Sequence, residues 1–217
     1  MSSPLEDGIS SVDLIDSLGG DLTVANAARV SLHKYHEQFT SGDAKLIQYL
    51  AEHGHWTPFS QVMLTFRIKM PIFVARQWFK HQVGFTRNEV SRRYVTDKPE
   101  LYFPKKWRAA APGVKQGSSD ETIEQNTEIN DVVREYGYGD AELYTTLLKQ
   151  GVAPEMARMV LPQSTYTEFI ETASLYAYAR LYKLRIDPAA QWEVRQYAEV
   201  IGELVHDVAP ISWEALW

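Results

Sequence analysis

The eighteen residues 77–94 contain the side chains of this sequence whose types and spacing are best suited to chemistry. They hold one acid, Glu89, against several cations, with amide, hydroxyl and imidazole groups between them; the cations are Lys80, Arg87, Arg92 and Arg93. Guanidinium groups beside short polar donors form a natural receptor for phosphate. The interleaved aromatic rings offer flat surfaces for a planar ring system; they are Trp78, Phe79, Phe85 and Tyr94. The plainer alternative is a helix end and loop whose basic groups are only solvated.

The composition is that of an ordinary globular protein. The chain has 217 residues, which suits one domain over 1–217 with a substantial core. It is 45% hydrophobic and 23% charged. No apolar run approaches the roughly 20 residues that span a bilayer, and the polar, acidic start does not resemble a secretory signal. We therefore expect a cytoplasmic protein without a membrane partner.

Cysteine is absent, which excludes disulfides, thiolate metal sites and a cysteine nucleophile. The 6 histidines show no spacing typical of a zinc site, so we expect no metal. The net charge of -6 argues against a general nucleic-acid coat protein. A local basic face could still bind nucleic acid.

Apolar and polar residues alternate from 62 to 70, which predicts a half-buried strand. Pro71 then suits the first turn of a helix that runs through Phe79 and leads to a loop at Gly84. Residues 164–172 are also rich in β-forming types. We expect an α+β domain, with helices flanking an antiparallel sheet.

Short helices are expected at 23–33 and 43–53, the second capped by Ser41 or Asp43 and stopped by Gly54. A last helix is expected to begin at Asp187-Pro188 and to bury an apolar stripe. The stripe consists of Trp192, Tyr197, Val200, Ile201 and Val205.

Between these elements, residues 121–149 are expected to be mostly helical, with an interruption considered at 136–139 because of its two glycines. A further helical turn is expected at 154–160, closed by Pro162. Small residues, Pro and Gly at 109–119 predict a flexible loop.

The segment 77–94 resembles the signature of the flavin-dependent thymidylate synthases, which is Arg-His-Arg, seven residues and a serine, usually continuing through Arg-Tyr. Lys80-His81-Gln82 occupies the Arg-His-Arg position, and 88–94 looks like the NExSxRY end of the motif. Other blocks follow the order of the family over most of residues 27–192. They are 27–31, 53–59, 71–78, 157–162, 184–187 and 190–193.

This resemblance implies an enzyme that methylates dUMP, with methylenetetrahydrofolate as carbon donor, FAD as hydride carrier and NADPH as reductant. The missing cysteine agrees with it, because the other class of thymidylate synthase attacks the uracil ring with a cysteine thiolate. A reduced flavin makes a protein nucleophile unnecessary, because the cofactor carries the difficult chemistry. The family also implies a homotetramer whose active sites are shared between chains.

By the same resemblance, one set of residues holds the nucleotide, above all its phosphate: Gln77, Lys80, Glu89, Ser91, Arg92, Arg93 and Arg158. Arg185 matches an arginine proposed to face the uracil and to stabilise its ionised N3 form, which makes C5 a better nucleophile. The positions that contact flavin are Thr57, Lys80, His81, Gln82 and Glu89, together with the altered positions Ser174, Tyr176 and Arg180. A structural ion pair or helix end remains the alternative for Arg158 and Arg185.

Three features depart from the family pattern. Lys80 and Gln82 replace the two arginines of the motif, which removes two planar forks. Eight residues rather than seven separate Gln82 from Ser91, so we expect the loop to bulge or shift its register, and Arg87 could supply the lost charge. Around the flavin, the polar residues of the family are replaced at 174–180, and Ser60 stands where a glutamate is usual.

These departures leave alternatives open. They lie on the flavin and folate side, so hydroxymethylation, a dCMP substrate, or nucleotide binding without catalysis remain possible outcomes. A nucleic-acid-binding module that uses residues 80–93 is the alternative from a different class. Salt-dependent DNA binding without bound flavin would favour it.

Overall fold

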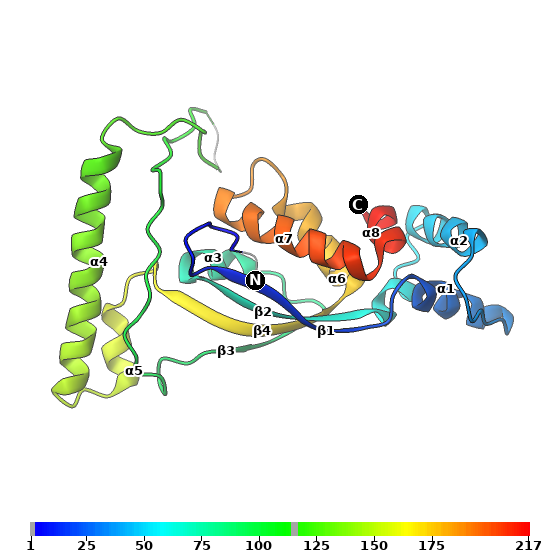
Figure 1. The fold of residues 1–217 in the computed structure, drawn as a ribbon, viewed down its shortest axis with the longest axis horizontal. Coiled ribbons are helices and arrows are strands. Elements are labelled where there is room, and N and C mark those ends of the chain that lie inside the picture. Colours follow the sequence, from blue (N-terminus) through cyan, green and yellow to red (C-terminus); the bar gives the residue numbers. More distant parts are fainter. Residues whose placement is uncertain (1–2, 114–116) are drawn as a thin grey trace.

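The computed structural model describes residues 3–113 and 117–217 and shows an α+β fold. Within these residues, antiparallel strands form a 4-stranded sheet in the order β1-β2-β4-β3. The strands are β1 (Ser11–Leu18), β2 (Met63–Pro71), β3 (Phe85–Glu89) and β4 (Tyr166–Ser174). In Figure 1, α3, α6 and α7 lie on one side of the sheet, α1, α2 and α8 lie at one end, and α4 stands at the other. The expected antiparallel sheet flanked by helices is confirmed.

The two central strands are the ones that the sequence predicts. The alternation at 62–70 corresponds to β2, shifted by one residue, and the β-forming run at 164–172 corresponds to β4. The edge strand β1 has no counterpart among the expected elements. Its second half is exposed, so its residues lack the apolar alternation that reveals β2.

The other edge strand, β3, occupies part of the segment expected to form an enlarged loop. It pairs with β4 in regular register, from Phe85 opposite Ala173 to Glu89 opposite Phe169. The chain turns just before it at Gly84, whose φ of 85° favours glycine. Pairing with β4 imposes this extended register, which the local sequence does not reveal. The expected bulge or register shift relative to the family pattern stays a prediction.

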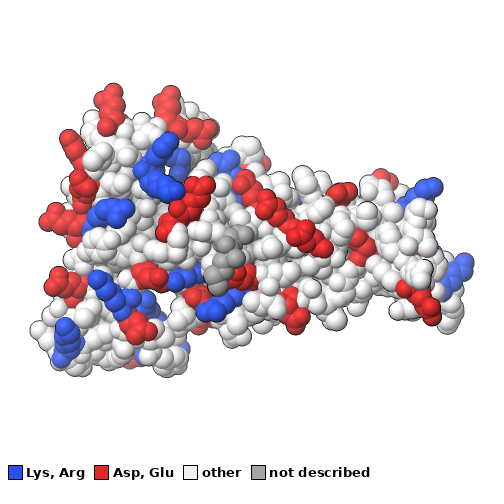
Figure 2. Space-filling model, viewed as in Figure 1, with Lys and Arg blue, Asp and Glu red and all other residues white. Residues whose placement is uncertain are grey.

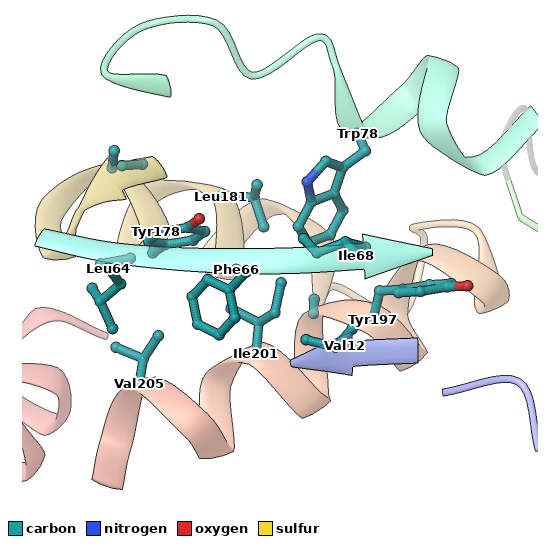
Figure 3. Close-up of a cluster of buried hydrophobic side chains, with 14 of the residues drawn as sticks. Val12, Leu64, Phe66, Ile68, Trp78, Tyr178, Leu181, Tyr197, Ile201 and Val205 are labelled. Carbon is teal, nitrogen blue, oxygen red and sulfur yellow. The ribbon is translucent and has the colours of Figure 1, made fainter. Parts of the chain in front are cut away.

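Three helices cover one face of the sheet: α3 (Ile72–Trp78), α6 (Leu175–Arg185) and α7 (Trp192–Val208). The alternate β2 residues Leu64, Phe66 and Ile68 are fully buried beneath them. Figure 3 shows these side chains in one cluster with residues of α6 and α7. The cluster includes Tyr178, Leu181, Tyr197, Ile201 and Val205.

The expected apolar stripe of α7 is largely confirmed, but its start is not. Tyr197, Ile201 and Val205 are buried, whereas the helix begins at Trp192 instead of Asp187. Asp187 instead closes a turn, because its side chain accepts the backbone N–H of Ala189 at 2.7 Å. Helix α6 was not among the expected elements; its buried residues surround the helix and hide any single apolar stripe.

At one end of the sheet, α1 (Asp21–Arg29) continues into a 3-10 turn (Val30–Leu32), which confirms most of the helix expected at 23–33. The other elements there are α2 (Ser41–Glu52), a 3-10 turn (Pro58–Gln61) and α8 (Pro210–Leu216). The cap of α2 is Thr40, not Ser41 or Asp43, because Thr40 and Asp43 form a capping box.

At the far end, α4 (Asn126–Lys149) is one uninterrupted helix of 24 residues. Gly137 does not break it: a side chain there would come within 3.1 Å of Phe103, so the glycine allows close packing. A short helix, α5 (Pro154–Ala157), and a 3-10 turn (Arg158–Val160) confirm the helical turn expected at 154–160. No helix in the described ranges has the length and apolar character needed to cross a bilayer.

The loop expected at 109–119 includes residues 114–116, which lie outside the described residues. Its ends are held together: Arg108 and Thr122 form an antiparallel bridge, and Ser119 donates its backbone N–H to Ala109 at 2.9 Å. The flexibility of this loop stays a prediction.

Candidate active site

A cavity of about 460 Å³ lies where β3 ends and β4 begins. Its volume is within the range of about 300–1,000 Å³ that is usual for small-molecule sites. Its wall brings together several residues expected to hold a nucleotide: Glu89, Ser91, Arg92, Arg93 and Arg158. We call this cavity the β3–β4 pocket.

A tight turn directly after β3 presents two of the arginines. Within residues 91–94, the backbone N–H and the Nε–H of Arg93 both donate to Ser91 Oγ at 3.3 Å. Arg92 donates to the backbone carbonyl of Asp97 at 2.5 Å. These contacts shape the turn and leave other N–H groups of both guanidinium forks available, since each fork carries five.

The β3–β4 pocket carries a net positive charge. Arg158 enters it from the 3-10 turn after α5, where its Nε–H donates to the carbonyl of Glu155 at 3.3 Å. None of its three arginines has a carboxylate partner within the described part of the chain, and Glu89 is the pocket's single acid. Glu89 accepts the hydroxyl of Thr167 at 2.5 Å. Such a site is complementary to an anion.

The structure adds pocket residues that the motif did not predict. Thr165 and Thr167 line the pocket at the start of β4. The hydroxyl of Thr165 is buried and has no hydrogen-bond partner in the described residues, whereas that of Thr167 is bound to Glu89. A signal was present in the sequence, because two polar residues spaced by two positions share one face of a strand.

A second polar cluster joins the end of α6 to the segment after α3. Arg185 donates its Nε–H to His81 Nε2 at 2.8 Å. Burial, followed by the charges of Arg185, Arg87 and Arg180, lowers the pKa of His81 to about 4. The imidazole is therefore neutral near pH 7 and can accept this hydrogen bond.

Arg87 does not replace the motif's lost phosphate-binding charge. It forms a salt bridge with Glu171, which is fully buried on β4 directly opposite it. Trp78 donates its indole N–H to the same carboxylate at 3.2 Å. The guanidinium also lies over the rings of Phe79 and Phe85, 5.2 and 4.7 Å from their centroids. Because the buried carboxylate requires a cation, Arg87 is occupied inside the fold.

Several residues predicted to contact nucleotide or flavin do not line the β3–β4 pocket. Lys80 and Gln82 are exposed beside His81, beyond the end of α3. Gln77 is half-buried, and its Oε1 has no partner among the described residues.

The remaining residues predicted to contact flavin lie near the first turns of α6. Ser174 caps this helix by accepting the backbone N–H of Ala177 at 3.3 Å. Tyr176 packs at 5.8 Å from Trp56, the neighbour of Thr57, measured between ring centroids. Arg180 is exposed one turn further along. None of these three side chains lines the β3–β4 pocket, whereas Glu89, which is also expected to contact flavin, does.

Comparisons with known proteins agree with the motif. The family model described as thymidylate synthase complementing protein matches residues 13–211. A flavin-dependent thymidylate synthase of Thermus thermophilus is 42% identical over 205 residues, which are 94% of this chain and 74% of that protein. The enzyme of the same name from Thermosipho africanus is 41% identical over 205 residues, covering 93% and 88%.

A solved structure shares the fold over nearly the whole chain. The UMP/dUMP methylase PolB from Streptomyces cacaoi, bound with 5-Br dUMP, superposes with a TM-score of 0.85 at 29% identity. The match covers 95% of this chain and 94% of PolB. The extent of the sequence matches, together with the motif residues gathered in the β3–β4 pocket, shows that this chain is an enzyme of the flavin-dependent thymidylate synthase family.

Proposed function

We propose that this protein transfers a one-carbon unit from methylenetetrahydrofolate to C5 of dUMP and forms dTMP, with reduced FAD as hydride donor and NADPH as reductant. The main support is the β3–β4 pocket, where three arginines without carboxylate partners in the described chain surround space for a small molecule. The names of the relatives and the 5-Br dUMP bound to PolB agree with this reaction.

The nucleotide phosphate is assigned to this pocket. Arg92 and Arg93 approach from the turn after β3, and Arg158 approaches from a different segment. Guanidinium groups from two directions can each donate paired hydrogen bonds to phosphate oxygens. The hydroxyl of Ser91, which already accepts from Arg93, can donate its own proton to the same group.

Arg185 is assigned to the uracil ring. A fixed cation beside the ring lowers the pKa of N3, and the ionised ring has a more nucleophilic C5. Arg185 increases the reactivity of C5 by stabilising the negative charge of the ionised ring, without itself contacting C5. Burial lowers the pKa of Arg185 itself, so its charge is only partly screened by water.

The chemistry of the region around α6 fits a flavin. Thr57, Lys80, His81 and Gln82 would hold FAD together with Glu89, Ser174, Tyr176 and Arg180. The exposed indole of Trp56 packed against Tyr176 offers a flat surface, and Arg180 has no carboxylate partner in the described ranges. When bound, FAD would supply the hydride that a protein side chain cannot.

We also propose that residues 1–217 act as one domain in a cytoplasmic homotetramer with shared active sites. Exposed apolar side chains support further assembly, among them Leu18, Tyr35, Tyr94 and Tyr136. On the face drawn in Figure 2, acidic and basic side chains are interspersed, which does not favour a general nucleic-acid surface.

The visible spectrum of the purified protein tests the flavin. A flavin absorbance, or thermal stabilisation that grows with the logarithm of added FAD, is expected. Mass analysis of the product from dUMP, methylenetetrahydrofolate, FAD and NADPH then tests the reaction. Thymidylate is expected; a product heavier by one oxygen atom would indicate hydroxymethylation. Unchanged dUMP together with conversion of dCMP would refute the substrate.

A further inference from the structure

His81 and Arg185 form a hydrogen bond between two segments that are 104 positions apart in the sequence. We propose that His81 is a positioning residue: it accepts the Nε–H of Arg185, so that the two terminal nitrogens of the guanidinium group are directed to the uracil. This inference rests on the function proposed above. It gives His81 a role toward the nucleotide in addition to the flavin contact that its motif position implies.

The donor and acceptor roles follow from the chemistry of the two groups. A guanidinium only donates hydrogen bonds, so the 2.8 Å contact requires a lone pair on His81 Nε2. The imidazole must therefore be neutral and carry its proton on Nδ1. A protonated ring would present a second donor and a positive charge to Arg185, which would repel it.

The surroundings of His81 keep it neutral. Arg185 and Arg180 approach it from α6, and Arg87 approaches from β3; together with burial they oppose protonation. Glu171, the buried acid of β4, is already bound by Arg87 and Trp78. The negative charge of Glu171 is therefore neutralised by Arg87. The net electrostatic effect on the imidazole comes from the arginines, which oppose its protonation.

This contact restrains Arg185 without neutralising it. A carboxylate partner would hold the guanidinium equally well but would cancel the positive field that the uracil requires. A neutral acceptor orients the side chain and leaves the charge intact. Preorganised donors of this kind accelerate a reaction because they need not reorient when charge develops.

An NMR titration tests the contact without any ligand. With histidine labelled at 13Cε1 and the signal assigned through His81→Gln, His81 should remain mostly neutral at about pH 5.5, where an ordinary histidine is mostly protonated. Arg185→Met should move its midpoint upward, because a nearby cation is lost. Arg134→Met, which removes an exposed arginine of α4, is the matched control and should leave the midpoint unchanged. An ordinary midpoint in the parent protein, or no response to Arg185→Met, overturns the proposal.

Measurements of kcat distinguish the proposed role of His81 in positioning Arg185 from a role in contacting the flavin. His81→Gln keeps an acceptor oxygen, whereas His81→Leu keeps bulk but accepts nothing. At saturating FAD, we expect kcat of the Leu variant to be lower than that of the Gln variant by about tenfold or more, with similar dUMP KM and FAD affinity. Equal kcat values contradict the proposal. If the parent protein does not convert dUMP, the proposed function fails, and the NMR titration alone decides the contact.

Discussion

Arg87 on β3 and Glu171 on β4 face each other in register and form a salt bridge whose acid is completely shielded from water. Burial raises the pKa of Glu171, and the adjacent guanidinium opposes that shift by stabilising the carboxylate. The pair attaches the edge strand β3, and therefore the start of the turn that carries Arg92 and Arg93, to the central strand β4.

Breaking this buried pair should destabilise the protein strongly. Glu171→Gln leaves a buried guanidinium without its counterion, so we expect a loss of about 3–5 kcal/mol in the free energy of unfolding. The double variant Arg87→Met, Glu171→Leu should recover most of it. Urea denaturation measures both.

The exposed pair Arg67–Glu168, which joins β2 and β4 of the same sheet, provides the matched control. Glu168→Gln should cost no more than about 1 kcal/mol, because water screens a surface pair. If Glu171→Gln and Glu168→Gln lose the same free energy of unfolding, burial is not the reason why the Arg87–Glu171 pair stabilises the protein.

The two threonines of the β3–β4 pocket should respond in opposite directions to the same substitution. Thr165→Val removes a buried hydroxyl that has no partner in the described structure, so the free energy of unfolding should rise by about 1 kcal/mol. Thr167→Val removes the donor to Glu89 and should lower it by about 0.5–1.5 kcal/mol. Thermal melts of the two variants show the sign, and a shared sign would contradict the hydrogen-bond assignment.

Substitutions of the pocket arginines and of Arg185 should affect different quantities, dUMP affinity in the first case and kcat in the second. Arg93→Ala and Arg158→Ala should each weaken dUMP by about 1.5–3 kcal/mol, the scale of a charge-assisted hydrogen bond. Arg185→Ala should lower kcat more than it weakens dUMP. Arg134→Ala is the control for loss of an arginine outside both sites. Calorimetry and steady-state kinetics provide the values; weak binding with full turnover at saturation in Arg185→Ala would reverse the assigned roles.

Acid should destabilise the protein through His81. Its pKa is lowered from 6.5 to about 4 in the folded state, so the unfolded chain binds the extra proton between these pH values. Stability from this group is complete above about pH 6.5 and is lost as pH falls toward 4. His81→Gln should reduce the change in the free energy of unfolding between about pH 4 and pH 6.5. His55→Gln, which replaces an exposed histidine, should leave that pH dependence unchanged. Identical pH profiles for the two variants would exclude His81 as the source.

The sequence alone determined the features that depend on neighbouring residues. Alternation of apolar side chains predicts β2, because burial on one face of a strand repeats every two residues. The pocket residues Glu89, Ser91, Arg92 and Arg93 lie together because they are almost consecutive. The motif and its spacing therefore placed this part of the pocket and the family without any coordinates.

Only the tertiary structure decided which distant groups meet. Arg87 and Lys80 both carry a positive charge near the motif, yet only Arg87 is opposite a buried acid 84 positions away. Likewise, β3 becomes a strand because β4 offers it a free edge, and His81 binds Arg185 because α6 ends beside the segment after α3. These outcomes depend on which surfaces pack together and on how much water they exclude, and both properties arise only when remote segments are brought into contact.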